Sequence, residues 1–366
     1  MRQTIACAAL LAVCAGPVAA KEMTDDFERG PLDAERWYLR QVNPAERVTF
    51  FAPGRCSARA VRITAQPGDV GESCDKPCQR SEVRVAKAYQ PSPEGEVWYA
   101  FSFRVTGDIP PLGSGRNVVG QIKAPPTSGS PFLAQRIDNG VFHITVESGP
   151  ARRVIASSNG DPDAMLQAQA FLGRFDRSNP SVQASVETLV AASRLSQSNL
   201  LIGQTILAPN FLALSQTNSP PDVDTPPALD NNRGAWLLSR LSYLSEISNY
   251  IGYTDIKITP GPRPVLPDPR IKWVDMVYRI KAGRTDNLFG PKREGEIDVW
   301  ADGEHVVSVR GQIGDQITVK PTDPGMYFKF GVYRDDASYP QSMEFDQFRQ
   351  SSKPLAPTAN CPAPTR

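Results

Sequence analysis

Histidine is scarce in this sequence, and several common catalytic motifs are missing. Only His143 and His305 occur among 366 residues, and they do not form an HExxH pair. A histidine-rich metal enzyme is therefore not expected. The sequence also lacks a G-x-S-x-G turn, a glycine-rich phosphate loop and a dinucleotide fingerprint. These absences argue against serine hydrolases of that type and against nucleotide-binding enzymes.

Long apolar runs are also missing, apart from a short one near the start. A basic beginning and an apolar stretch at residues 4–13 precede small residues at 18–20. This pattern is typical of a signal peptide over residues 1–20, followed by a mature chain from Lys21. The stretch is shorter than the roughly 20 apolar residues of a membrane span. We expect a periplasmic or secreted protein without a membrane span, and a lipoprotein anchored at Cys14 is the disfavoured alternative.

An excess of charge of one sign is absent as well. The 40 basic and 39 acidic residues give a formal net charge of +1. Binding to nucleic acid through bulk charge is therefore not expected. An anionic ligand would have to be held by local basic groups.

Cysteine outside the signal segment is limited to Cys56, Cys74, Cys78 and Cys361. An even number in an exported chain predicts two disulfides, and the three possible pairings stay open. A zinc site at Cys74 and Cys78 is disfavoured, because no second cysteine or histidine pair has zinc-like spacing. No cofactor is expected to be required. Calcium stays open, although no Asp-rich loop demands it.

Alternating apolar and polar residues predict many short strands in two parts of the chain. Residues 25–150 and 270–350 carry these segments, separated by glycine and proline turns. Such a pattern favours a β-sandwich. We therefore predict an all-β fold, with one domain over residues 21–366 that is interrupted by a Pro-rich, partly helical insertion at about 150–268. Residues 352–366 are expected to form a loose Pro-rich tail.

Two helices are expected inside the insertion. Val182, Val186 and Leu189 follow an Asn-Pro pair at helical spacing. A second run of apolar residues at helical spacing covers about 235–251. The intervening sequence is rich in proline.

The segment 79–84 places two arginines and a glutamate on one face of a predicted strand. Arg80, Glu82 and Arg84 alternate with apolar or small residues, so they project together. The planar guanidinium group suits carboxylate ligands. The alternative is a solvated strand face with cross-strand ion pairs.

The segment 327–334 has a similar alternation of polar and apolar side chains. Tyr327, Lys329, Gly331 and Tyr333 share a face, while the phenylalanines between them face the predicted core. A lysine beside a tyrosine can prepare the phenol for proton transfer. A glycine within a strand often marks the close approach of a ligand, and we expect Gly331 to leave open space there. The alternative is an ordinary amphipathic strand.

Gln121 and Lys123 also share one face of a predicted strand. On their own, two polar residues at this spacing are more typical of the solvated side of a sheet than of a binding site.

Taken together, these segments resemble the jelly-roll polysaccharide lyases, most closely the heparin lyase I-like group and more distantly the alginate lyases. The resemblance covers about 200 residues of the predicted sandwich, and the insertion lies outside it. It implies a concanavalin A-like jelly roll, an acidic polysaccharide as substrate and a monomer. The segments that carry it are residues 79–84, 97–103, 121–123, 295–303 and 328–334.

The reaction implied by the resemblance is β-elimination at a uronic acid. Groups that neutralise the sugar carboxylate make the C5 proton acidic, a base removes it, and an acid protonates the leaving O4. By resemblance, Tyr333 is the acid, the base or both, and Lys329 adjusts Tyr333 or holds the sugar. The resemblance further implies carboxylate binding by Arg80, Arg84 and Gln121, orientation of the arginines by Glu82, and sugar contacts by Tyr327 and Arg334.

One position departs from the pattern of the family. Lys123 stands where these lyases carry a histidine. An ordinary lysine is protonated at neutral pH, whereas histidine is poised near it. Three outcomes are open: Tyr333 serves both proton transfers, Lys123 has a lowered pKa, or His143 reaches the site as a substitute. For His143, a structural role is favoured. A binding protein that has lost activity is a further outcome.

A glycoside hydrolase is the alternative from another enzyme class. Glu296 and Asp298 resemble the start of the E-I-D-x-x-E strand of jelly-roll β-glucanases, which use paired carboxylates. Trp300 and Ala301 occupy the place of the further glutamate. Hydrolysis is thus disfavoured, and a carbohydrate-binding module without activity is the third alternative.

Overall fold

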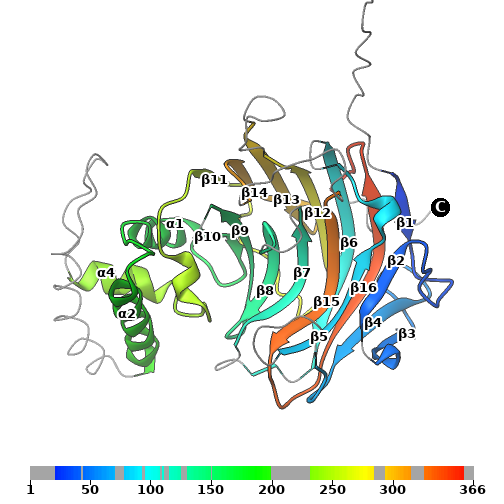
Figure 1. The fold of residues 1–366 in the computed structure, drawn as a ribbon, viewed down its shortest axis with the longest axis horizontal. Coiled ribbons are helices and arrows are strands. Elements are labelled where there is room, and N and C mark those ends of the chain that lie inside the picture. Colours follow the sequence, from blue (N-terminus) through cyan, green and yellow to red (C-terminus); the bar gives the residue numbers. More distant parts are fainter. Residues whose placement is uncertain are drawn as a thin grey trace, which may run out of the picture.

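A computed structural model describes residues 21–42, 44–70, 78–92, 95–107, 109–110, 115–124, 130–149, 151–198, 231–283, 293–314 and 325–357. Two antiparallel sheets pack face to face as a sandwich (Figure 1). The all-β jelly-roll fold with a partly helical insertion is thereby confirmed. No helix in these ranges is long and apolar enough to cross a membrane.

The larger sheet has nine strands in the order β11-β14-β13-β12-β6-β16-β4-β3, with β1 added beside β16. Its strands come from early and late parts of the sequence. The sheet is complete only when β16 has paired with β4 and β6. The bounds are β1 Met23–Asp25, β3 Val48–Phe51, β4 Ala60–Ala65, β6 Glu96–Thr106, β11 Ile256–Pro260, β12 Val274–Lys281, β13 Gly295–Ala301, β14 Glu304–Gly311 and β16 Gln341–Ser351.

The smaller sheet has seven strands in the order β10-β9-β8-β7-β15-β5-β2. The late strand β15 lies between two early strands, β5 and β7. The bounds are β2 Trp37–Val42, β5 Cys78–Val85, β7 Asn117–Lys123, β8 Leu133–Asp138, β9 Val141–Ser148, β10 Ala151–Ser157 and β15 Tyr327–Asp335. Short 3-10 turns are η1 Ala45–Arg47 and η2 Lys87–Tyr89.

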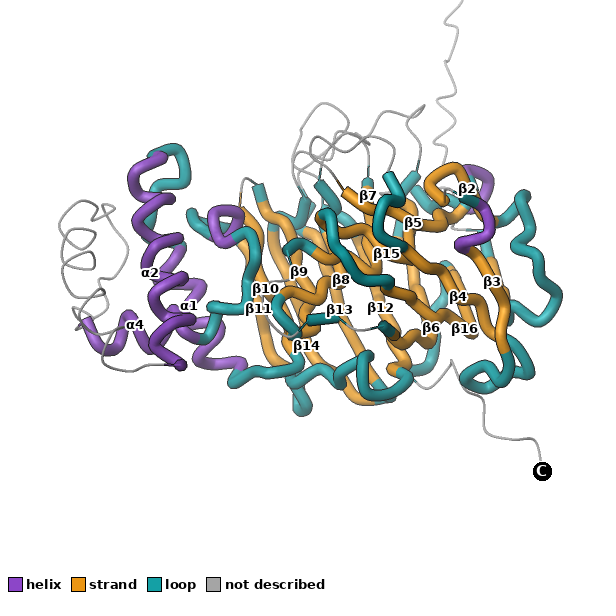
Figure 2. Tube along the Cα trace, turned by 90° about the horizontal axis from the view of Figure 1, so that it is seen from below, coloured by secondary structure: helices purple, strands orange, loops and turns teal. Residues whose placement is uncertain are grey.

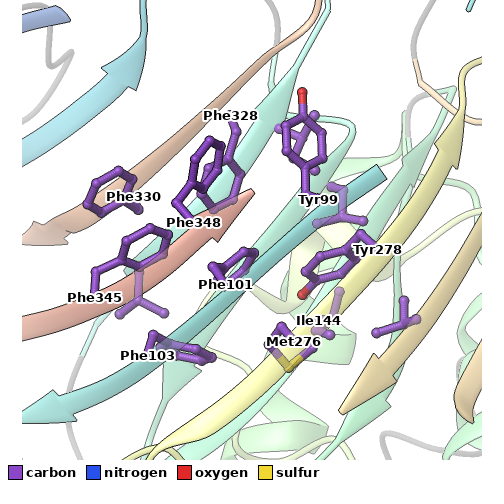
Figure 3. Close-up of a cluster of buried hydrophobic side chains, with 14 of the residues drawn as sticks. Tyr99, Phe101, Phe103, Ile144, Met276, Tyr278, Phe328, Phe330, Phe345 and Phe348 are labelled. Atoms are coloured by element: carbon purple, nitrogen blue, oxygen red, sulfur yellow. The ribbon is translucent and has the colours of Figure 1, made fainter. Parts of the chain in front are cut away.

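The core lies between the sheets and is rich in aromatic rings (Figure 3). Phe328 and Phe330 of β15 point inward and meet Phe345 of β16, and the rings of Phe330 and Phe345 stack 3.8 Å apart. Fully burying one such side chain contributes about 1.5–3 kcal/mol. Since the side-chain period of a strand is two, burial of these rings turns the residues between them to the opposite, outer face.

Helices occupy the insertion between β10 and β11. They are α1 Pro162–Leu172, α2 Pro180–Ser198, α4 Asn231–Ser239 and the 3-10 turn η3 Ile247–Tyr250. Asp161 caps α1 by accepting hydrogen bonds from the backbone of Asp163 and Ala164. The helices share a second apolar core, to which Val154 of β10 contributes. Figure 2 shows them beyond the β10 end of the sandwich.

Most predicted elements are present with small shifts in their ends. The helix expected after Asn179 is α2, whereas the run at 235–251 is divided into α4, a turn and η3. The Asp302-Gly303 turn has positive φ at both residues, which suits a two-residue hairpin. The domain boundaries proposed from the sequence stay a prediction, and the signal segment lies outside the described residues.

The cysteines are described only in part. Cys56 and Cys78 are each disulfide-bonded, while Cys74 and Cys361 lie outside the described residues. The pairing of the four cysteines therefore stays a prediction.

Candidate functional site

Most of the predicted site residues lie together on the outer face of the seven-stranded sheet. On β15, Lys329 pairs with Arg84 of β5 and Gln121 of β7, and Tyr333 pairs with Arg80. Pairing of Tyr327 with Lys123 extends the group along the strand. This surface, called the polar face below, is defined by Arg80, Glu82, Arg84, Gln121, Lys123, Tyr327, Lys329 and Tyr333.

Glu82 organises the centre of the polar face. It is 1% exposed, and its carboxylate accepts hydrogen bonds from Arg80 Nε at 2.6 Å and Gln121 Nε2 at 2.5 Å. Burial alone would raise the pKa of Glu82, but the charges of Arg80 and Lys329 and these hydrogen bonds hold it below its usual value. Glu82 is therefore an ionised anchor that fixes the orientation of Arg80 and Gln121.

Lys329 is almost fully buried beside this anchor. Its Nζ donates a 2.8 Å hydrogen bond to Oε1 of Gln41 on β2. Burial lowers the pKa of Lys329 from 10.5 to about 8, against the opposing effect of the Glu82 carboxylate. The ammonium group is thus charged at neutral pH and close to its titration range.

Arg84 lies between two tyrosine rings. Its guanidinium carbon is 4.2 Å from the ring centroid of Tyr38 on β2 and 4.9 Å from that of Tyr327. Such stacking holds the planar fork in a fixed orientation, which favours recognition of a carboxylate. Burial raises the pKa of Tyr327, so its phenol stays protonated at neutral pH.

Tyr333 is half-buried between two arginines. The guanidinium carbon of Arg80 lies 4.7 Å from its ring centroid, and that of Arg116 lies 4.6 Å away. Arg116 directly precedes β7 and forms an ion pair with Asp335 at 3.1 Å. The ring is therefore held in place by contacts with two guanidinium groups.

Lys123 lies at the end of β7 and is half-buried. Burial and the nearby charge of Arg80 lower its pKa, although Glu82 and Glu147 act in the opposite direction. A lowered pKa was one of the three outcomes expected for a lysine in the histidine position. It brings the amine closer to the range in which a base can act.

The expectation that Gly331 leaves open space is wrong. Its φ is +130°, and a side chain added there would bring Cβ to 2.2 Å from the backbone oxygen of Ser81. Gly331 is needed because β15 approaches β5 closely at a backbone angle that other residues rarely adopt.

The structure does not bring His143 to the other predicted residues. β9 is three strand steps from β15, which is about 14 Å at the usual strand spacing. His143 is fully buried, its Nε2 lies 3.8 Å from Asp138 Oδ2, and burial lowers its pKa to about 3. It is neutral at physiological pH and packs against the ring of Tyr243 in the insertion, so the structural role is the one that these contacts support.

Arg334 also lies apart from the polar face. It is 1% exposed and projects to the opposite side of β15 from Tyr333. Its Nε donates a 2.8 Å hydrogen bond to Gln79 Oε1, and its other nitrogens bond to Gln341 and to the backbone of Tyr339. These contacts join β15 to β5 and β16, so the structure separates Arg334 from the predicted sugar-binding group.

Sequence patterns did not single out Tyr38, Gln41 or Arg116. The first two lie on β2, where a bulge between them brings both to Arg84 and Glu82 of β5. The aromatic and β-branched residues of β2 were a strand signal, but its neighbour in the sheet is set only by the fold. Arg116 directly precedes the strand that carries Gln121. This proximity in sequence was the signal that could have identified Arg116 as a site residue.

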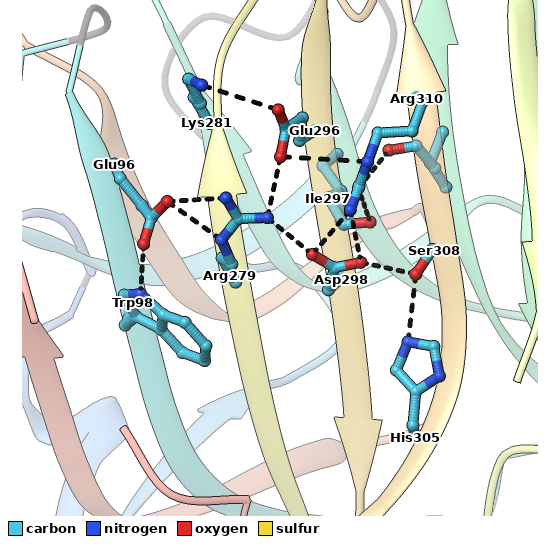
Figure 4. Close-up of polar contacts among 11 residues, drawn as sticks. Glu96, Trp98, Arg279, Lys281, Glu296, Ile297, Asp298, His305, Ser308 and Arg310 are labelled. Atoms are coloured by element: carbon cyan, nitrogen blue, oxygen red, sulfur yellow. Dashed lines mark hydrogen bonds and ion pairs between the residues drawn. The ribbon is translucent and has the colours of Figure 1, made fainter. Parts of the chain in front are cut away.

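The carboxylates considered for hydrolysis lie on the outer face of the other sheet (Figure 4). Arg279 donates hydrogen bonds to Glu96, Glu296 and Asp298 at 2.8–3.0 Å. Burial would raise the pKa of Glu296 and Asp298, but their hydrogen bonds and the charges of Arg279 and Arg310 hold both below the usual range. A general acid of a glycosidase needs a raised pKa, so this network fits a structural role.

In the described part of the chain, no group of three or more metal-binding side chains is present. The polar face instead combines arginine, lysine, glutamine and tyrosine side chains around a single glutamate. Such a set can bind an anionic sugar, stabilise negative charge and transfer protons.

Comparison with solved structures finds chains of similar architecture at low identity. The cellulose-induced protein Cip1 is 12% identical, with a TM-score of 0.40, and the match covers 92% of this chain and 99% of that one. A family 7 alginate lyase, A1-II′, is 12% identical, with a TM-score of 0.38 and coverage of 88% and 96%. An alginate lyase from Pseudomonas aeruginosa is 12% identical, with a TM-score of 0.33 and coverage of 88% and 100%.

Comparison with curated protein sequences gives no significant match. A family model gives a match in the last third of the chain, from β11 to β16. It includes the whole of β15, and thus Tyr327, Lys329 and Tyr333. The family whose model matches residues 248–350 is described as polysaccharide lyase.

Proposed function

We propose that this protein is an exported lyase that cleaves a uronic-acid-containing polysaccharide by β-elimination. The observation that carries the proposal is the convergence of Arg80, Gln121, Lys329 and Tyr333 on three adjacent strands. The match of residues 248–350 to the polysaccharide lyase family supports the reaction class. The uronate substrate, the export and the heparin lyase I-like subgroup are parts of the proposal.

The cations of the polar face would neutralise the sugar carboxylate. Arg84, held between two rings, and Lys329, close to Gln121, are the groups we assign to this role. As the C5 proton leaves, negative charge spreads onto the carboxylate, and fixed cations and amides stabilise this charge more in the transition state than in the substrate.

Tyr333 would carry the proton chemistry. The C5–H bond breaks as its proton passes to a base, a C4–C5 double bond forms, and the C4–O4 bond breaks as O4 takes a proton. We assign the base to Tyr333, Lys123 or both, and the proton on O4 to Tyr333. Contacts of the ring with Arg80 and Arg116 hold Tyr333 in position for these transfers.

The experiment is incubation of the purified mature protein with alginate, glucuronan and hyaluronan while ultraviolet absorbance is followed. β-Elimination leaves a conjugated unsaturated sugar that absorbs, whereas hydrolysis does not. New reducing ends without absorbance would overturn the lyase in favour of a hydrolase. Binding without either signal would identify a carbohydrate-binding module.

Tyr333→Phe tests the assigned residue. Phenylalanine keeps the ring between Arg80 and Arg116 and removes only the hydroxyl, so the fold should be retained. We expect a loss of about 10²–10⁴-fold in kcat, the usual contribution of a general acid or base. The control is Tyr253→Phe, because Tyr253 is an exposed tyrosine of the insertion. Full activity of Tyr333→Phe would refute the assignment.

A further inference from the structure

The helical insertion covers the outer surface of the seven-stranded sheet next to the polar face. Arg136, His143 and Thr145 lie on β8 and β9 and face away from the main core, yet each is at most 3% exposed. Figure 1 shows α1, α2 and α4 beside the β10 end of the seven-stranded sheet. The outer surface of β8 and β9 is therefore not open to a polymer.

The covering segment is the turn that follows α4, over residues 243–250. Asn139 Nδ2 donates a 2.7 Å hydrogen bond to the backbone oxygen of Tyr243, and Ser245 Oγ donates one of 3.0 Å to Asp138 Oδ2. These bonds are made at the end of β8. They hold the turn directly against the sheet.

Glu246 extends this cover toward Tyr333. Its carboxylate is 3.4 Å from Arg152 of β10 and 3.9 Å from Arg116. Arg116 in turn packs on the ring of Tyr333. A continuous chain of contacts thus runs from β10 to the residue assigned to proton transfer, and we call Glu246, Arg152 and Arg116 the end wall.

The outer surface of the sheet that the insertion leaves open is short. Tyr38, Arg84, Lys123 and Tyr333 are half-buried and lie on β2, β5, β7 and β15. Adjacent strands are about 4.8 Å apart, so this surface is only about 14 Å wide across the strands. A polymer that crosses it from β2 toward β7 meets the end wall directly after the predicted reaction centre.

We propose that the end wall makes this protein an exolytic enzyme, which binds a chain end of its uronate polymer and releases short products. The inference rests on the proposed lyase function. Arg116 would hold the carboxylate of the terminal sugar beside Tyr333, and the Glu246 carboxylate, which pairs with Arg116 and Arg152, would repel a further uronate beyond it.

The wild-type protein tests this directly, with the polymer of the panel that gives the highest rate. Absorbance and viscosity are followed together, and products are sized by chromatography. Exolytic cleavage gives a steady rise in absorbance and short products while viscosity stays high. An early collapse of viscosity with medium-sized products would overturn the exolytic mode and leave the lyase standing, whereas no absorbance from any polymer would overturn both.

Substitution of the wall adds a second readout. Glu246→Ala removes both ion pairs of the carboxylate, and we expect longer products and at least a twofold larger fall in viscosity per bond cut. Glu187→Ala is the matched control, because Glu187 is an exposed glutamate on α2 of the same insertion. If Glu246→Ala and Glu187→Ala gave the same product sizes, Glu246 would have no part in setting the cleavage mode. The wild-type experiment decides the mode even if Glu246→Ala does not fold.

Discussion

Arg80 Nε donates a 2.6 Å hydrogen bond to Oε2 of Glu82 two residues further along β5, although both side chains are at least nine-tenths buried. The pair lies under the predicted reaction centre. Because the pair is buried, removal of either charge leaves the other without a partner in a poorly solvating environment.

Replacement of Glu82 should therefore damage both stability and activity. In Glu82→Gln, the positive charges of Arg80 and Lys329 lose their common counter-charge, and we expect a loss of about 3 kcal/mol in the free energy of unfolding. The measurement is urea unfolding together with lyase activity. Glu304→Gln is the control, since Glu304 is exposed and its 3.6 Å pair with Arg263 lies at the surface. Equal stability of the two variants would contradict the role of Glu82.

Activity should decline as the pH rises through about 8. Lys329 titrates there because burial lowers its pKa from 10.5, and loss of its charge removes a group that neutralises the sugar carboxylate. Lys329→Arg keeps the charge at all accessible pH values, so the decline near pH 8 should be absent or moved upward in this variant. The measurement is the pH profile of kcat/KM. A wild-type profile that stays flat to pH 9.5 would exclude a required ammonium group at Lys329.

A side chain at position 331 should disrupt the sheet under the site. In Gly331→Ala, the added Cβ would clash with the backbone oxygen of Ser81. We expect the free energy of unfolding to fall by about 2–4 kcal/mol. Gly149→Ala is a matched control, because Gly149 also has a positive φ but no atom lies within 4 Å of the added Cβ. The control should lose only about 1–2 kcal/mol from backbone strain. Thermal unfolding of both variants provides the comparison, and a similar loss in each would show that close strand approach is not the cause.

The ion-pair network on the other sheet should matter for stability and not for catalysis. Arg279→Met leaves Glu96, Glu296 and Asp298 close together without their shared cation. We expect the free energy of unfolding to fall by about 1–3 kcal/mol, less than for a fully buried pair because the network is partly exposed to solvent. Activity on the uronate polymer should stay within twofold of wild type at a temperature where both are folded. A large loss of activity under these conditions would indicate that this face of the larger sheet takes part in catalysis.

The alternation of residues along β5 and β15 was enough to predict which side chains share a face. The period of two follows from strand geometry, so it could be read from residues 80–84 and 327–333 alone. The cap of α2 at Asn179 and Pro180 was equally local. These features depend on neighbours in sequence, and for that reason they could be predicted.

Long-range features were not accessible in the same way. Gln41 reaches Lys329 only because β2 pairs with β5, and His143 is enclosed only because the turn after α4 returns to β8. The role of Gly331 depends on the path of β5, which the sequence around residue 331 does not contain. Alternation alone already places Arg334 on the face opposite Tyr333, whereas its partners on β5 and β16 depend on the fold.

The position of β15 has a consequence for when the site can exist. This strand follows β5 and β7 at a long distance in the sequence, yet it lies between them in the sheet. A chain that stops before Tyr327 lacks β15, so β7 and β5 are left as unpaired edges of two separate groups of strands. Arg80 and Arg84 then have no Tyr333 beside them. The proposed activity therefore requires β15, and we expect a chain that lacks this strand to be inactive.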